Sequence, residues 1–282
     1  MKKIIFAIFA MALTINASAQ YKGEIEIYKL GDFTLHSYKS FEAMADVSFI
    51  IEGENELIVL EQQSFFQSMK DFNNYLATIN KPVVKVIANY HTGGLAEWNP
   101  SLIVMVEGMP EFEKGEIYSG MLGYFAQIFE GAMDTRGRHG EVATVPFNST
   151  QKWAGINFKF LHGAKSDFPA ASINIGNKVY YTHFAPVFEH MTDNQIVNPQ
   201  AIDATYDELS NAKASGCILF IGSHGKAGRL DAVDFQLQYL AKMKETFKKA
   251  KSKDEFVKTM TDSFVGISGV DNLKTVADKL YK

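Results

Sequence analysis

The sequence contains little cysteine and carries little excess charge of either sign. Its single cysteine, Cys217, cannot form an internal disulfide bond, and the surrounding run CILFIGSH is typical of a buried strand. The formal net charge is -4, which gives no electrostatic reason to expect binding to nucleic acid, because such binding requires a basic face. Beyond the N-terminal segment, no stretch is long and apolar enough for a membrane helix. The sequence therefore predicts neither a disulfide scaffold, nor a nucleic-acid-binding protein, nor a protein inserted in a membrane once this segment has been removed.

Residues 1–19 have the pattern of a signal peptide. Lys2 and Lys3 precede an apolar run that extends to about Ile15, and Ala17-Ser18-Ala19 follows. A charged start, a short apolar run and an Ala-x-Ala sequence are typical of exported proteins. No cysteine follows the cleavage site, which argues against a lipid anchor. We therefore expect a mature chain that begins at Gln20 and is periplasmic or secreted.

Hydrophobic residues make up 46% of the chain, enough for residues 20–282 to bury a full core as one large α/β domain or as two small ones. We expect a single domain. Four early runs predict antiparallel strands, namely EIEIYKL, FTLHSY, VSFIIEG and ELIVLEQ. A helical stripe follows from Ser64 to Asn80, and after Pro82 the run VVKVIANY predicts another strand. Because a strand, a helix and a strand in succession form a parallel crossover, Glu61 and residues 89–91 should lie at one sheet edge.

The second part of the sequence alternates between strand and helix patterns. Residues 110–133 predict a helix interrupted by glycines, and residues 135–150 predict a long polar loop. Further strands are predicted at LIVMVEG, WAGINFKFLHG, ASINIG, KVYYTH and CILFIGSH. Further helices are predicted at residues 199–214, 230–250 and 254–281, and the last region forms a helical extension from about residue 252 to the C-terminus at residue 282.

This order of strands and helices resembles the metallo-β-lactamase fold superfamily. The run FIIEGENELIVLEQQSF is similar to the entry hairpin and second strand of that family, and IGSHG is similar to its last metal-binding turn. The resemblance extends from about Glu24 to Leu240. It implies an α/β fold, specifically a four-layer αββα sandwich of the metallo-β-lactamase type, with extra C-terminal helices.

The metal-binding loop of the family differs from the corresponding loop of this chain. Family members carry His-x-His-x-Asp-His immediately before Gly-Gly, whereas this chain reads VIANYHTGGLAEW. Asn89 stands in the place of the first histidine, His91 matches the second, and the Asp-His pair is absent. Glu61 stands where the family has an acidic residue at the end of its second strand. The resemblance therefore implies an altered site that holds at most one metal ion.

Three histidines remain at strand ends that the resemblance places at one edge of the fold, and these are His91, His183 and His224. Three imidazoles and a water molecule are a sufficient ligand set for a catalytic zinc ion. The alternative is that each histidine is only a hydrogen-bonded polar residue at the end of its strand. We expect either one zinc ion held by these three residues or none.

Other polar residues are candidates for the same site. The turn HGAKSDFPAAS replaces a further ligand loop of the family, and it contains Lys165 and Asp167. These two side chains are expected to bind an anionic substrate or to orient an imidazole, with a solvated turn as the alternative. Together with Glu61 they form the predicted catalytic set. Tyr90 and Trp98 are expected either in an aromatic wall of the pocket or in the core.

Two classes of function follow from these residues. The first is a hydrolase-like protein that acts on a small ester, lactone, thioester or amide, with a small molecule as its partner. The second is a non-catalytic relative that binds a ligand or a partner in the bacterial envelope. The absence of the Asp-His pair favours the second class, whereas three retained histidines favour the first. Fold alone does not decide between them, because one fold serves many functions.

Overall fold

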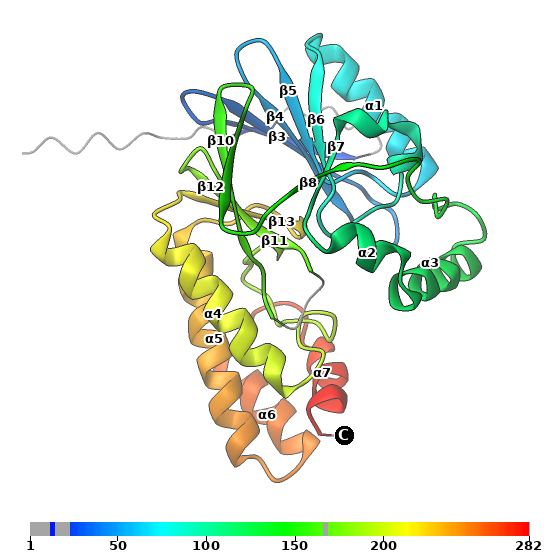
Figure 1. The fold of residues 1–282 in the computed structure, drawn as a ribbon. Helices are drawn as coiled ribbons and strands as arrows, with labels where there is room; N and C mark the ends of the chain where they lie inside the picture. The colour runs from blue at the N-terminus through cyan, green and yellow to red at the C-terminus, as the bar shows by residue number, and fades with distance from the viewer. Residues whose placement is uncertain (1–11, 15–22, 166–168, 282) are drawn as a thin grey trace, which may run out of the picture. The chain divides into compact units, whose positions relative to one another are not determined.

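The computed structural model describes residues 12–14, 23–165 and 169–281 (Figure 1). Apart from residues 12–14, the predicted signal peptide lies outside the described residues. Contacts within the chain divide it into two compact units. The first unit comprises residues 1–104, 119–143 and 152–156, and the second comprises residues 105–118, 144–151 and 157–282. A single domain that includes both units stays a prediction.

An eight-stranded sheet follows the chain order without interruption. Its strands are β1 (Ala12–Thr14), β2 (Glu24–Lys29), β3 (Thr34–Lys39), β4 (Val47–Glu52), β5 (Leu57–Leu60), β6 (Val83–Ile87), β7 (Ile103–Val106) and β8 (Ala143–Val145). The pairs from β1 to β5 are antiparallel, whereas β5, β6 and β7 are parallel. The expected antiparallel series and the parallel crossover are both present.

Helix α1 (Phe66–Ile79) forms the crossover between β5 and β6. Its apolar stripe is buried through Met69, Phe72 and Leu76, and Asn80 ends the helix in a left-handed conformation. Polar contacts also join α1 to β3. The Tyr38 hydroxyl donates to Asp71 at 2.8 Å, and a ring nitrogen of His36 lies 2.7 Å from the Tyr75 hydroxyl. The four side chains, Tyr38, Asp71, His36 and Tyr75, are buried. Each has a hydrogen-bond partner, as stable burial of a polar group requires.

The segment after β6 contains two short 3-10 helices, η1 (Leu95–Glu97) and η2 (Pro100–Leu102), which lead into β7. The predicted interrupted helix is present as α2 (Met109–Lys114) and α3 (Glu116–Ile128), separated at Gly115. The predicted polar loop at 135–150 is partly wrong, because it contains β8 and the start of β9 (Ser149–Trp153). These short strands carry few apolar residues, so the hydrophobic pattern did not reveal them.

A second sheet has five strands in the order β13-β12-β11-β10-β9. Besides β9 they are β10 (Ile156–His162), β11 (Ala171–Ile175), β12 (Val179–Phe184) and β13 (Leu219–His224). The run WAGINFKFLHG, expected as one strand, turns instead between β9 and β10 at Ala154 and Gly155, which have φ angles of 50° and 78°. Strands β10 to β12 are antiparallel, whereas β12 and β13 are parallel and are connected through α4 (Pro199–Ala214).

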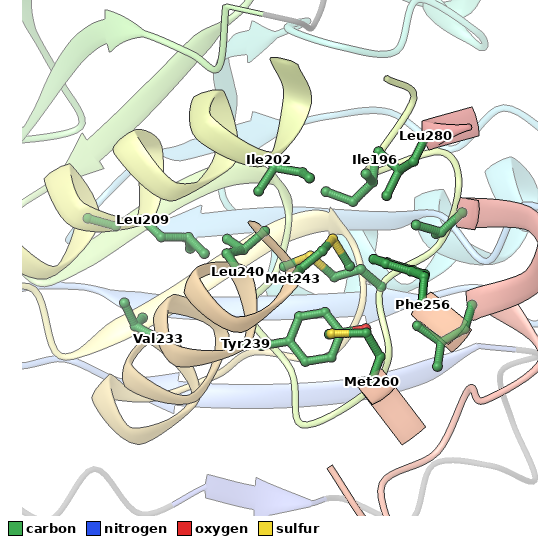
Figure 2. Close-up of a cluster of buried hydrophobic side chains, with 14 of the residues drawn as sticks. Ile196, Ile202, Leu209, Val233, Tyr239, Leu240, Met243, Phe256, Met260 and Leu280 are labelled. Carbon is green, nitrogen blue, oxygen red and sulfur yellow. The ribbon is translucent and has the colours of Figure 1, made fainter. Parts of the chain in front are cut away.

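The C-terminal region is helical, as predicted, and comprises α5 (Leu230–Lys249), α6 (Lys253–Ser263) and α7 (Asn272–Leu280). Figure 2 shows the buried side chains that hold these helices together, with Tyr239, Leu240 and Met243 of α5 in the same cluster as Phe256 and Met260 of α6. The extension is thus part of the core of the second unit. Within the described residues, no helix is both long and apolar enough to cross a membrane.

His190 is the buried polar residue that ties this helical region to the chain before α4. One ring nitrogen, Nδ1, lies 3.0 Å from the Tyr239 hydroxyl. The backbone N–H of His190 donates to Ser268, and its carbonyl accepts from the Asn272 side chain at 3.2 Å. The Nε2 atom is buried without a hydrogen-bond partner. Burial lowers the pKa of His190, because the charged imidazole is poorly solvated there.

Acidification should therefore destabilise the second unit. The folded-state pKa of His190 lies below its ordinary value of 6.5, so its contribution to stability is complete above about pH 6.5 and is lost as the pH falls below it. We expect the free energy of unfolding, measured by urea denaturation, to fall less on acidification in His190→Gln than in the wild type. His139→Gln, at an exposed residue, should behave like the wild type. An unchanged pH dependence in His190→Gln would contradict this assignment.

Candidate functional site

His183 and His224 lie together at the ends of the parallel strands β12 and β13. Their ring centroids are 5.3 Å apart. Phe184 stacks on His224 at 5.1 Å and so restricts the orientation of that imidazole. The backbone N–H of Ala185 donates to the His224 carbonyl at 2.9 Å, which keeps the two strand ends in register. The second unit therefore presents two half-buried imidazoles side by side, as the sequence predicts for these two residues.

The two strand ends approach closely because β13 contains a glycine. A Cβ atom at Gly222 would lie 2.2 Å from the backbone nitrogen of Ala185. No side chain fits at that distance, so a residue other than glycine would push the end of β12 away from β13. Gly222 is therefore required for the spacing of the two histidines.

In the first unit, Glu61 fixes the loop that carries His91. We call residues Asn89–Gly94 the histidine loop. The buried Glu61 carboxylate accepts the backbone N–H of Tyr90 at 2.8 Å through Oε1 and that of His91 at 3.0 Å through Oε2. The Nδ1 atom of His91 lies 3.9 Å from Oε2. Both carboxylate oxygens are thus engaged in positioning the loop. A direct catalytic role for Glu61 stays a prediction.

Glu61 adopts a left-handed backbone conformation, with a φ of 58°. Such a conformation costs a residue other than glycine on the order of 1–3 kcal/mol and is typical of functional sites, where surrounding contacts maintain it. Here the two hydrogen bonds to the histidine loop supply those contacts. The strained turn after β5 directs the carboxylate beneath the loop.

The Gly-Gly pair lets the histidine loop pack directly on the chain that follows Glu61. A Cβ atom at Gly93 would lie 2.4 Å from Ser64 Oγ, and one at Gly94 would lie 2.3 Å from the carbonyl oxygen of Gln63. Gly94 also has a positive φ of 79°, which favours glycine. The two glycines are therefore explained by close backbone approach within the first unit.

Asp46 is a buried acidic residue near the histidine loop that the sequence analysis did not single out. It precedes β4, and its backbone carbonyl accepts from the Gln63 side chain at 3.2 Å. Burial raises the pKa of Asp46 to about 6, while the nearby His91 acts in the opposite direction. A single Asp before an apolar run carries no sequence signal of its own, because its burial results from long-range packing.

The side chains of four further residues were predicted at or beside the site. Lys165 is exposed in the turn after β10, and Asp167 lies outside the described residues. Tyr90 is fully buried in the core, whereas Trp98 is half-buried and lines a cavity. The roles proposed for Lys165 and Asp167 stay predictions.

Glu61→Gln should loosen the histidine loop. The substitution replaces one acceptor oxygen by an amide NH₂, which cannot accept a backbone N–H, and leaving one buried donor unpaired costs about 1–3 kcal/mol. We expect a corresponding fall in the free energy of unfolding and faster hydrogen exchange at the amides of Tyr90 and His91. Glu54→Gln, in the exposed turn before β5, is the matched control. Exchange rates equal to those of the wild type would show that Glu61 does not hold the loop.

No protein-family model and no curated protein sequence matches this chain. Solved structures do match it. The DIM-1 metallo-beta-lactamase matches with a TM-score of 0.52 and 12% identity over 77% of this chain and 97% of its own. A double mutant of the sec-alkyl sulfatase PisA1 matches with a TM-score of 0.59 and 13% identity over 90% of this chain and 49% of its own.

A metallo-beta-lactamase family protein from Thermus thermophilus also matches, with a TM-score of 0.55 and 9% identity over 89% of this chain and 93% of its own. These neighbours share the two sheets and the flanking helices of a mixed α/β fold. At such low identities the likeness concerns the fold alone. The fold class predicted from the sequence is confirmed: this chain has the metallo-β-lactamase fold.

Proposed function

We propose that this chain is an exported, hydrolase-like protein that holds one metal ion with His91, His183 and His224. Each of the three residues offers one ring nitrogen as a ligand. The observation that carries the proposal is the pair of imidazoles, His183 and His224, at the ends of β12 and β13. The substrates would be small esters, lactones, thioesters or amides. Neighbours of the same fold include a metallo-beta-lactamase and a sec-alkyl sulfatase, which supports hydrolytic chemistry.

The donor set fits one zinc ion better than two. Neutral imidazole nitrogens are common zinc ligands, and three of them leave a fourth position for water. The histidine loop contains no carboxylate to bridge a second ion, and the amide of Asn89 is a poor zinc ligand beside imidazole. Glu61 is occupied with two backbone N–H groups. A mononuclear site is therefore the arrangement that these residues support.

A zinc ion held by these residues would lower the pKa of its bound water and would act as a Lewis acid towards a carbonyl group. The residues of the chain itself contribute orientation. Glu61 holds the backbone at His91, and Phe184 restricts the ring of His224. Such groups behind metal ligands fix the geometry of the site and thereby its affinity. Lys165, which is exposed in its turn, would bind an anionic group of the substrate.

Metal binding tests the ligand set. Protein purified without chelators should bind at most one zinc ion per chain. His91→Ala, His183→Ala and His224→Ala should each weaken binding by at least about 100-fold, more than the 10- to 100-fold typical of residues behind the ligands. His139→Ala, at an exposed loop residue, should bind like the wild type. Competition with a chromophoric chelator measures these affinities, and two tightly bound ions per chain would refute the mononuclear site.

Hydrolysis by the zinc-loaded protein decides between the two classes of function. A panel of one ester, one lactone, one thioester and one amide with chromogenic leaving groups covers the proposed substrate class. The wild type should hydrolyse at least one of them, and His183→Ala should lose that activity together with the metal. Zinc binding without hydrolysis, or no zinc binding, would favour the non-catalytic alternative.

Export is tested at the N-terminus. Mass spectrometry of protein recovered from its native cells should find a mature chain that begins at or near Gln20, in the envelope or the medium. The reason is the Ala-x-Ala sequence at residues 17–19, after a charged and apolar start. Replacement of Ala17 and Ala19 by bulky residues should leave the precursor uncleaved. Recovery of an intact chain that begins at Met1 in the cytoplasm would contradict export.

A further inference from the structure

A groove with apolar walls lies in the first unit, beside α1. Its volume is about 600 Å³, and ligand pockets commonly have volumes of about 300–1,000 Å³. The lining comes from the loop between β3 and β4, from the first part of α1 and from Ala132. None of the predicted catalytic or metal-binding residues is among the lining residues. The groove is therefore a candidate for a second site, separate from the three histidines.

Two phenylalanine side chains of the lining are exposed to solvent. Phe41 is 68% exposed and Phe66 is 43% exposed, while Phe65, which also lines the groove, is buried. Neighbouring exposed apolar side chains, unlike single ones, are typical of surfaces that bind an apolar partner. Covering these rings with a ligand would remove apolar surface from water, which is favourable. The walls of the groove therefore favour a ligand with an apolar body.

Contacts within the first unit hold the aromatic walls in place. The Arg136 guanidinium lies over the Phe66 ring, 5.6 Å from its centroid. The backbone N–H of Phe66 donates to the carbonyl of Ala132 at 3.1 Å. The Phe65 ring packs edge-to-face on Phe129, with the two centroids 4.9 Å apart. Walls that are fixed before a ligand arrives lose little conformational freedom on binding, which favours affinity.

The two charged residues of the lining, Glu42 and Lys70, differ in their partners. The Glu42 carboxylate accepts from the Ser40 hydroxyl. It also accepts the backbone N–H groups of Met44 at 2.6 Å and of Asp46 at 3.1 Å, so it is engaged within its own loop. Lys70 is exposed and forms no ion pair with any residue that the structure describes. The charge left for a ligand to pair with is therefore positive.

We propose that this groove binds a medium-chain alkyl carboxylate. The alkyl chain would lie against Phe41, Phe65 and Phe66, and the carboxylate would pair with Lys70. Lys70 comes one helical turn after Phe66 on α1, and residues four apart lie on the same face of a helix. Because Lys70 is exposed, the carboxylate would keep most of its hydration, which limits the cost of removing charge from water.

Calorimetric titration with octanoate tests the apolar part of the proposal. The protein is first freed of metal with a chelator, so that the carboxylate has no ion to bind at the histidines. Octanoate should give a saturable heat signal. Heptanoate and hexanoate should bind more weakly, by about fourfold for each CH₂ group removed, because one buried CH₂ group contributes about that factor. Octan-1-ol, which carries the same chain without a charge, serves as the neutral probe.

Substitutions test the charge and the walls. Lys70→Gln should weaken octanoate binding about two- to fivefold, as expected for an exposed ion pair, and leave octan-1-ol unaffected. Lys29→Gln, at an exposed lysine of the same unit, is the matched control. Phe41→Ala should weaken both probes at least about fourfold, the equivalent of one buried CH₂ group. Phe188→Ala, at an exposed phenylalanine of the second unit, is its control.

The outcome is independent of the proposed hydrolytic site, because no proposed metal ligand lines the groove. His183→Ala should therefore bind octanoate like the wild type, and loss of binding in that variant would overturn the proposal. The absence of a saturable signal from the wild type, shown to be folded by circular dichroism, would overturn it as well. So would equal effects of Lys70→Gln and Lys29→Gln. Binding to phosphatidylcholine vesicles without saturable binding of octanoate would indicate a membrane-binding surface in place of the proposed site.

Discussion

The contact between the Glu61 carboxylate and two backbone N–H groups is the interaction on which the candidate site depends. A buried carboxylate is costly unless its oxygens are hydrogen-bonded. At Glu61 the compensation comes from the backbone of Tyr90 and His91, at 2.8 and 3.0 Å. The same two bonds thus stabilise the buried charge, maintain the left-handed conformation of residue 61 and fix the position of His91. Removing the carboxylate affects all three at once.

In both units, glycines let the backbone segment that carries a histidine pack directly against a neighbouring segment. Gly93 and Gly94 bring the histidine loop against residues 63 and 64, and Gly222 brings the ends of β12 and β13 together. In each case a Cβ atom would lie below 2.5 Å from a neighbouring atom, which no side chain tolerates. The imidazoles are therefore carried by backbone segments that are held by packing at a glycine. Preorganisation of this kind is what a metal site or a binding site requires, because ligands must be held before the ion or substrate arrives.

The elements with strong periodicity could be predicted from the sequence, and those without it could not. Helix α1 is revealed by its stripe of Met69, Phe72 and Leu76, β5 by its continuous apolar run LIVL, and β6 by the run VVKVI, in which Lys85 is the one charged residue. The turn at Ala154 and Gly155 was missed because Ala rarely has a positive φ, so the run read as one strand. Of the proposed site residues, His91, His183 and His224 could be singled out because each lies at or just beyond the end of an apolar strand. Asp46 could not, because only tertiary packing buries its carboxylate.

Most of the buried acidic residues of the first unit are engaged in contacts within its own fold. Its buried carboxylates among the described residues are Asp46, Glu61, Asp71 and Asp134. Asp71 accepts the Tyr38 hydroxyl, Asp134 is bound by the Arg136 guanidinium, and Glu61 accepts two backbone N–H groups. Burial raises the pKa of Asp46 to about 6, because the charged carboxylate is poorly solvated there. A second ion would have to displace one of these partners, and the first unit would then lose a contact that stabilises its fold. The proposal of at most one ion agrees with this use of the buried carboxylates of the first unit in its fold.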